Sequence, residues 1–171
     1  MATNLALRDL WPPNRKVMTA PIPVDHPLSL GLVQRGGTYQ ANHACRQADV
    51  LLALGVRFDD RTSSSWIPGY SFTIPPTQLI HVDIDPEEIG RNYPVTLGLM
   101  ADVRTFMRQL LAELSARNIA SEPAGPRRKW LADIDSYRKT WNTFVAPGMI
   151  DESTPINPQR AAVEIDKALP E

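Results

Sequence analysis

The clearest pattern in the chain is an unbroken apolar run, Val50 to Leu54, that passes directly into a group of charges. Five consecutive apolar residues without polar alternation are typical of a strand buried on both faces, as in a parallel sheet with helices above and below it. In open α/β sheets, ligands bind in the crevice beyond the carboxyl ends of the strands. The pattern therefore predicts a binding site at the charged residues that follow the run: Arg57, Asp59, Asp60 and Arg61.

Further apolar segments continue the alternation of helices and strands. Residues 37–47 predict a short helix, and residues 78–84 ("QLIHVDI") and 94–100 ("PVTLGLM") predict two more strands. Asp102 opens a helix at 102–115, whose apolar residues recur every three or four positions. We expect an α/β fold in which 49–55 and 78–83 are interior, parallel strands and the two helices pack on the faces of the sheet.

The remaining segments divide the chain into four parts. Residues 1–21 are rich in proline and predict an irregular N-terminal segment, and 22–117 form the α/β unit. Residues 118–156 read as a linker followed by a helix, because Trp130, Ile134 and Tyr137 share one helical face. Residues 157–171 predict a last helix, which Asn157 caps and Pro158 begins. The two final helices lie outside the alternating pattern and are expected as additions to the sheet.

Charge and composition narrow the function classes. The chain has 171 residues, with 18 basic and 19 acidic side chains and no basic cluster, which argues against nucleic-acid and membrane partners. No apolar run approaches the roughly 20 residues of a membrane span, and the start of the chain lacks the pattern of a secretory leader. We expect a soluble, cytoplasmic protein. The single cysteine, Cys45, excludes an internal disulfide, and the three histidines lack metal-ligand spacing, so we expect no metal site.

The charged strand ends allow two interpretations. Arg57 and Arg61 could bind phosphates, and Asp83, after the second strand, could accept a hydrogen bond from a ribose hydroxyl. Alternatively, the charges after the first strand pair with one another on a surface loop, which contributes little. The G-x-G-x-x-G fingerprint of a standard dinucleotide site is absent. Asp83 and Asp85 could also act as an acid/base pair, but no nucleophile is near them in the sequence, and we assign no catalytic residue.

Five ordered motifs carry a resemblance to a known family. "IPVDHPLSLG", "GGTYQAN", "ADVLLALGVRFDDR", "HVDIDPEEIGRN" and "ADVRTFMRQLLAEL" closely resemble the central domain of thiamine-diphosphate-dependent enzymes, with the acetolactate synthase catalytic subunit as the nearest match. The resemblance covers residues 22 to 114, and the closing "INPQRAAVEIDKALPE" looks like the entry to that family's diphosphate-binding domain. It implies a Rossmann-like parallel sheet whose first strand and glycine-rich turn have no counterpart in this chain.

In the acetolactate synthases this domain binds FAD, although the net reaction is not a redox one. The resemblance therefore implies that FAD, or another nucleotide, is the ligand at the charged strand ends. It departs from the family at Arg35–Thr38, where the family often has "MHGT". By motif position, the implied nucleotide-binding residues are Gly55, Val56, Arg57, Asp59, Arg61, Asp83, Ile84, Glu88, Asp102 and Val103.

The same resemblance limits what the chain can do. Thiamine catalysis in this family needs a glutamate from a preceding domain and a GDG-to-NN motif from a following one, and neither is present in the 171 residues. Thiamine diphosphate and magnesium would therefore enter only through flanking domains, and we expect no activity from this chain alone. Flanking domains or a second copy of the chain are the expected partners. Two alternatives stay open: an independent module that binds FAD, ADP or a coenzyme A fragment, and a purely structural or dimerising unit.

Overall fold

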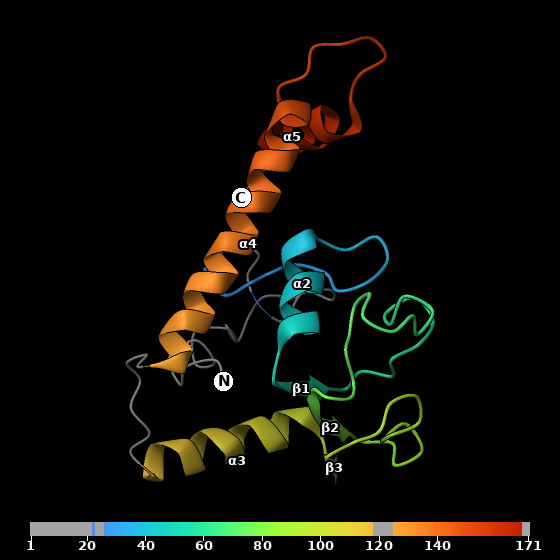
Figure 1. Ribbon diagram of the computed structural model, residues 1–171, viewed down its shortest axis with the longest axis vertical. Coiled ribbons are helices and arrows are strands. Elements are labelled where there is room, and N and C mark those ends of the chain that lie inside the picture. Colours follow the sequence, from blue (N-terminus) through green and yellow to red (C-terminus); the bar gives the residue numbers. More distant parts are fainter. Residues whose placement is uncertain (1–21, 23–25, 118–124, 169–171) are drawn as a thin grey trace.

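The computed structural model describes residues 22, 26–117 and 125–168. In this part of the chain the strands form a three-stranded parallel sheet in the order β1-β2-β3. The register pairs Val50 with Gln78 and Ile80 with Leu97. The predicted α/β class and the parallel pairing of the first two strands are confirmed. The elements are α2 (Tyr39–Gln47), β1 (Val50–Leu54), β2 (Gln78–Asp83), β3 (Leu97–Met100), α3 (Val103–Ala116), α4 (Pro126–Met149) and α5 (Pro158–Ala168) (Figure 1).

One face of the sheet carries the core. Helix α2 begins after Thr38, whose hydroxyl accepts a hydrogen bond from the Ala41 amide at 3.3 Å. Cys45 of α2 packs against a buried cluster formed by strand residues and by aromatic residues of the long loop between β1 and β2. Burial raises the pKa of the Cys45 thiol to about 11, which keeps it protonated. The cluster consists of Ala53, Phe58, Phe72 and Leu79.

The opposite face of β1 is largely open, and here the prediction of an interior strand was wrong. Among the described strands β1 lies at the edge, and the side chains of Val50 and Leu52 are 52% and 40% exposed. β2 is the interior strand, and its Leu79 and Val82 are fully buried. The apolar run did identify a strand. A run of this kind does not indicate whether the strand is buried by its own domain or by another domain or a second copy of the chain.

Helix α3 begins directly after β3. The Asp102 carboxylate caps it by accepting a hydrogen bond from the Thr105 amide at 2.8 Å. In Figure 1, α3 extends to the left of the strands, below α2, and none of its residues is fully buried. The third strand is shorter than predicted, because Pro94 has no N–H and pairing begins only where the Thr96 amide reaches the Leu79 carbonyl.

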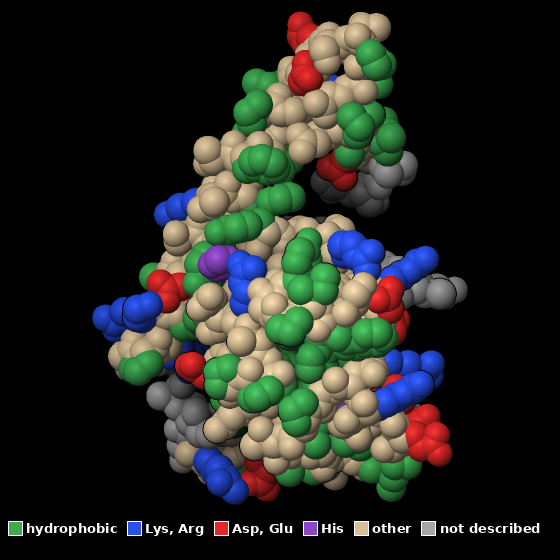
Figure 2. Space-filling model, turned by 45° about the vertical axis from the view of Figure 1, so that its right-hand side comes forward, with side chains coloured by type: hydrophobic (Ala, Val, Ile, Leu, Met, Phe, Trp, Pro, Cys, Tyr) green, Lys and Arg blue, Asp and Glu red, His purple; other side chains and the backbone are tan. Residues whose placement is uncertain are grey.

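The predicted additions after the sheet are present as α4 and α5, which together form an arm (Figure 1). α4 packs on α2, where the rings of His43 and Tyr137 lie 4.5 Å apart, and α5 packs on α4. Hydrophobic side chains continue along the arm (Figure 2). The predicted segment 1–21 and part of the predicted linker, 118–124, lie outside the described residues. None of the described helices is long and apolar enough to span a membrane.

Candidate functional site

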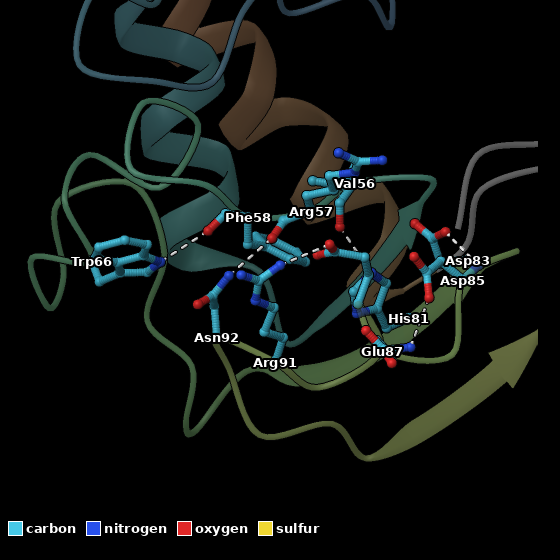
Figure 3. A network of polar contacts seen from close by, with 11 residues as sticks. Val56, Arg57, Phe58, Trp66, His81, Asp83, Asp85, Glu87, Arg91 and Asn92 are labelled. Atoms are coloured by element: carbon cyan, nitrogen blue, oxygen red, sulfur yellow. Dashed lines mark hydrogen bonds and ion pairs between the residues drawn. The ribbon is translucent and has the colours of Figure 1, made fainter.

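A cleft of about 350 Å³ lies beyond the carboxyl ends of β1 and β2. Its walls come from the loop that follows β1 and from the turn that follows β2, so Arg57 and Asn92, 35 positions apart in the sequence, meet there (Figure 3). Three of its lining residues, Arg57, Asp59 and Glu88, belong to the set of predicted nucleotide-binding residues. The lining residues are Arg57, Asp59, Asp60, Trp66, Glu88, Arg91 and Asn92.

The loop after β1 begins with a sharp change of direction. The Gly55 amide still continues the ladder, donating to the Val82 carbonyl at 2.8 Å, but Gly55 itself has φ +61°, a conformation that suits glycine. Arg57 follows as an exposed residue whose main-chain carbonyl accepts a hydrogen bond from the Asn92 side chain at 3.0 Å. Among the described residues its guanidinium has no hydrogen bond or ion pair.

His81 joins the two loops that form the cleft. Its side chain is 1% exposed and lies in β2, between the loop after β1 and the turn after β2. Nε2 lies 2.8 Å from the Val56 carbonyl, and the Gly90 amide donates to Nδ1 at 3.4 Å. Because the carbonyl only accepts and the amide only donates, these contacts fit the tautomer with its proton on Nε2. His81 is therefore a structural residue of the site, and sequence reasoning passed over it because it looked for metal-ligand spacing.

Glu88 has a buried carboxylate with one oxygen unpartnered. The residue is 7% exposed, and its Oε1 accepts a hydrogen bond from Arg91 Nη1 at 2.8 Å. Its Oε2 is buried and has no hydrogen-bond partner in the structure. A buried carboxylate oxygen without a partner carries a desolvation cost that a ligand donor would relieve. Glu88 lines the cleft, and its unpartnered oxygen lies buried beneath the cleft surface.

Trp66 forms a wall of the cleft that was not expected from the sequence. Its indole is 43% exposed, and its Nε1 donates to the Phe58 carbonyl at 2.9 Å (Figure 3). Ser64, Ser65 and Trp66 all have φ near +55°, in the sparsely populated left-handed region. The loop is thereby folded back so that its tryptophan faces the turn after β2. Apolar periodicity gives no sign of such a turn, and the only available signal was a tryptophan in a serine-rich loop.

The other predicted residues divide into two groups. Asp59 is exposed, and its carboxylate accepts a hydrogen bond from the Thr62 amide at 2.8 Å, which lowers the pKa of Asp59. Arg61 lies on the same loop but does not line the cleft, and Val56 is partly buried against the core.

The second group lies at the end of the sheet, outside the cleft lining. Asp83 is 7% exposed and accepts a hydrogen bond from the Asp85 amide at 3.0 Å, so its carboxylate stabilises its own turn. In Figure 3, Asp83 and Asp85 lie on the far side of His81 from Trp66. The remaining members are Gly55, Ile84, Asp102 and Val103, none of which lines the cleft.

Charges of both signs meet in the cleft. Arg57 and Arg91 supply two cations, against three carboxylates. One of these, Asp60, lies 3.8 Å from Arg35, and another, Glu88, is paired with Arg91. On the face drawn in Figure 2, acidic and basic side chains are interleaved rather than separated by sign. Such a site suits a small molecule that carries both phosphates and hydroxyl donors better than it suits a polyanion.

The residues that line the cleft include three carboxylates and two arginines, and no serine, cysteine or lysine. Within the described ranges, no group of three or more His, Cys, Asp or Glu side chains is arranged to hold a metal ion.

Comparison with known proteins places the same segment in context. Residues 18–110 match the family model of the thiamine pyrophosphate enzyme central domain. The chain is 36% identical over 149 residues to a probable acetolactate synthase large subunit of Methanocaldococcus jannaschii, covering 87% of this chain and 23% of that protein. It is 35% identical to the acetolactate synthase isozyme 3 large subunit of Escherichia coli over 68% of this chain and 19% of that one. Acetolactate synthase 1 of Zea mays is 34% identical over 85% of this chain and 21% of its own length.

The chain thus spans about a quarter or less of the length of these relatives. The matched segment, 18–110, contains the whole described sheet and every residue that lines the cleft. The similarity to the family therefore covers the part of the chain that contains the candidate site.

Proposed function

This chain belongs to the family of thiamine pyrophosphate enzyme central domains, and from that premise we propose that it is the nucleotide-holding scaffold of an acetolactate-synthase-like enzyme acting on 2-oxo acids. In this proposal the cleft beyond β1 and β2 binds an adenine nucleotide, and the carbon–carbon chemistry takes place in flanking domains. The relatives named above are acetolactate synthase large subunits.

The observation that carries the proposal is the buried, unpartnered Oε2 of Glu88 beside two arginines. A nucleotide satisfies both features at once. Its phosphates pair with Arg57 and Arg91, and a ribose hydroxyl donates to the free carboxylate oxygen. In the surface-loop alternative, Arg57, Asp59, Asp60 and Arg61 pair with one another, but among the described residues Asp60 lies in an ion pair with Arg35 instead.

The size of the cleft bears on which nucleotide fits. Ligand pockets usually measure about 300–1,000 Å³, and the cleft is at the lower end of that range. It suits adenosine diphosphate, or that part of FAD, better than a complete flavin dinucleotide. We propose that the predicted residues outside the cleft, Gly55, Ile84, Asp83, Asp102 and Val103, are available to the rest of a longer ligand. The bound nucleotide bridges the two loops and takes no part in the carboligation.

Titration tests the nucleotide site directly. ADP and FAD are titrated by calorimetry into the wild-type chain, Arg57→Ala and Arg61→Ala. A charge-assisted hydrogen bond to phosphate contributes about 1.5–3 kcal/mol, so Arg57→Ala should weaken binding roughly ten-fold or more. Arg61→Ala is the matched control, because Arg61 lies on the same loop but outside the cleft lining. If the wild-type chain binds neither ADP nor FAD, the nucleotide proposal fails. Equal affinities for wild type and Arg57→Ala would mean that the nucleotide binds at a site that does not include Arg57.

We propose further that the chain does not synthesise acetolactate alone. Positioning of reactants can contribute roughly 7–11 kcal/mol, and the glutamate and the GDG-to-NN motif that thiamine catalysis needs in this family are absent from the 171 residues. Purified chain supplied with thiamine diphosphate, magnesium, FAD and pyruvate should form no acetolactate. Activity that appears only with separately expressed flanking domains supports the proposal, and turnover by the chain alone contradicts it.

A scaffold role has its own support in the exposed apolar face of β1. Val50 and Leu52, at 52% and 40% exposure, are the kind of surface that another domain or a second copy of the chain covers. On this reading α5 leads into the diphosphate-binding domain. Sedimentation of the chain, alone and with flanking domains, distinguishes an oligomer from a domain partner. A strict monomer that binds no added domain would argue against the scaffold role.

A further inference from the structure

We propose that His43 makes the packing of α4 on α2 sensitive to pH. At neutral pH the ring holds the two helices together, and in mild acid its protonation loosens the contact and with it the arm formed by α4 and α5. The inference goes beyond the proposed nucleotide function and does not depend on it, because His43 and its partners Tyr39, Arg46 and Tyr137 lie outside the cleft lining.

The imidazole of His43 lies at the contact between the two helices. On α2 it stacks on the ring of Tyr39, with the ring centroids 5.0 Å apart. From α4 the ring of Tyr137 meets it edge-on, with the centroids 4.5 Å apart. A change in the charge of this ring therefore acts on both helices at once.

The contact at Nδ1 of His43 requires one protonation state of the ring. Arg46 Nη2 lies within hydrogen-bond distance of Nδ1. A guanidinium only donates, so the contact fits a ring whose Nδ1 carries no proton. The same guanidinium donates to the Gly69 carbonyl at 3.3 Å, which ties it to the loop after β1. The ring is therefore bonded to a cation that is itself held in place.

Protonation of His43 replaces this hydrogen bond by repulsion. A proton on Nδ1 leaves two donors facing each other and places an imidazolium against the guanidinium of Arg46. Burial and, to a smaller extent, the charge of Arg46 lower the pKa of His43.

The charged groups next to Tyr137 on α4 do not offset this repulsion. Asp133 is paired with Lys129 at 2.6 Å, and Arg138 donates to the Ser29 carbonyl at 3.2 Å. Within the described part of the chain, no carboxylate forms an ion pair with His43 that would favour its charged form. The protonated ring therefore has a cation on α2 and no compensating anion on either helix.

The pH range of the effect follows from the lowered pKa. His43 binds a proton more readily once α4 has moved away than while it is docked, so protonation favours the undocked arm. Docking is fully stable above the ordinary pKa of histidine, about 6.5. It weakens as the pH falls from there through the lower pKa of the docked state.

Hydrogen exchange of the α4 amides around Tyr137 tests the proposal in the whole chain. Wild type and His43→Phe are compared at about pH 7.5 and about pH 5.5, on either side of the histidine range. The ratio of their rates at one pH cancels the intrinsic pH dependence of exchange. Phenylalanine keeps a ring between Tyr39 and Tyr137 but cannot titrate. The two proteins should exchange alike at the higher pH, and wild type should exchange about three- to ten-fold faster at the lower one, because a hydrogen bond is lost.

Two variants of Arg46 separate its charge from its structural contacts. Arg46→Lys keeps a cation that donates to Nδ1, and the acid response should remain. Arg46→Gln has an amide that donates to the neutral ring and, turned over, accepts from the protonated one, so most of the acid response should disappear. The amides of β2 are the internal reference and should exchange alike in all four proteins.

Three results would overturn the inference. The first is equal exchange of α4 in wild type and His43→Phe at both pH values. The second is an acid response in Arg46→Gln as large as in wild type. The third is acid-enhanced exchange that extends equally to the amides of β2, which would assign the response to unfolding of the whole chain. A failure of the chain to bind nucleotides would contradict the proposed function and leave this inference standing.

Discussion

Two turns follow the interior strand β2 in close succession, and each begins with a buried carboxylate. Asp83 and Glu88 are equally buried, at 7% exposure, and both were expected to bind a nucleotide. Asp83 is partnered within its own turn, through the Asp85 amide, whereas Glu88 lines the cleft and its buried Oε2 has no partner. We propose that the hydrogen-bonding state of these two carboxylates, and not their burial, distinguishes their roles. In this proposal the Glu88 turn contacts ADP, and the Asp83 turn has a structural role toward ADP.

The largest effect should come from the residue that holds both loops of the cleft in place. His81→Ala leaves the Val56 carbonyl and the Gly90 amide without their side-chain partner and opens a cavity in the core. The free energy of unfolding should fall by about 3–5 kcal/mol, as measured by urea denaturation. Gln78→Ala, an exposed position on the same strand, is the control and should change it by less than about 0.5 kcal/mol. A small loss in His81→Ala would mean that His81 does not join the loops.

The Asp83 turn should respond as a structural element. Asp83→Ala removes the acceptor of the Asp85 amide, and the free energy of unfolding should decrease by about 1–3 kcal/mol. ADP affinity, measured by calorimetry on the folded variant, should stay within about threefold of wild type. A large loss of ADP affinity with unchanged stability would reverse the roles assigned to the two turns.

The smallest effect concerns the start of α3. The Thr105 amide donates to the Asp102 carboxylate, which lowers the pKa of Asp102 in the folded state. The cap's contribution is therefore present above the unfolded pKa, about 3.9, and is lost as the pH falls through the lower, folded value. Helix content followed by circular dichroism should decrease slightly in that acid range. Asp102→Asn keeps the cap without a titrating group, so its curve should be flatter there. Identical acid profiles would show that the cap's charge is not involved.

The sequence predicted the elements that depend on local periodicity. Val50–Leu54, the helix after Asp102 and the helix after Asn157 were all expected within a few residues of where they occur, because apolar spacing and capping residues act over short distances. The expectation that β1 is covered on both faces failed because coverage depends on what packs against a strand, and the apolar run of β1 does not encode that.

The cleft was predicted only in part, for a related reason. Arg57 and Asp59 closely follow β1, and their position was predicted from the rule that ligands bind at strand ends, whereas Glu88 was implied only by the family resemblance. Trp66 reaches the cleft through three residues in left-handed conformations, and Arg91 and Asn92 reach it through a turn held by His81. Non-glycine residues in left-handed conformations are rare, and the periodicity of apolar residues does not predict where they occur. The vacant acceptor of Glu88 is a property of packing that only the folded structure displays.

The most direct test of the account compares the two carboxylates by a single measurement, ADP affinity from calorimetry in Glu88→Gln and in Asp83→Asn. Both changes remove one charge and keep the size of the side chain. The account predicts that Glu88→Gln weakens ADP binding about ten-fold or more, since a charge-assisted hydrogen bond is lost, while Asp83→Asn leaves it within about threefold. Equal affinities in the two variants, or a greater loss in Asp83→Asn, would contradict the assignment of the nucleotide site to the cleft at Glu88.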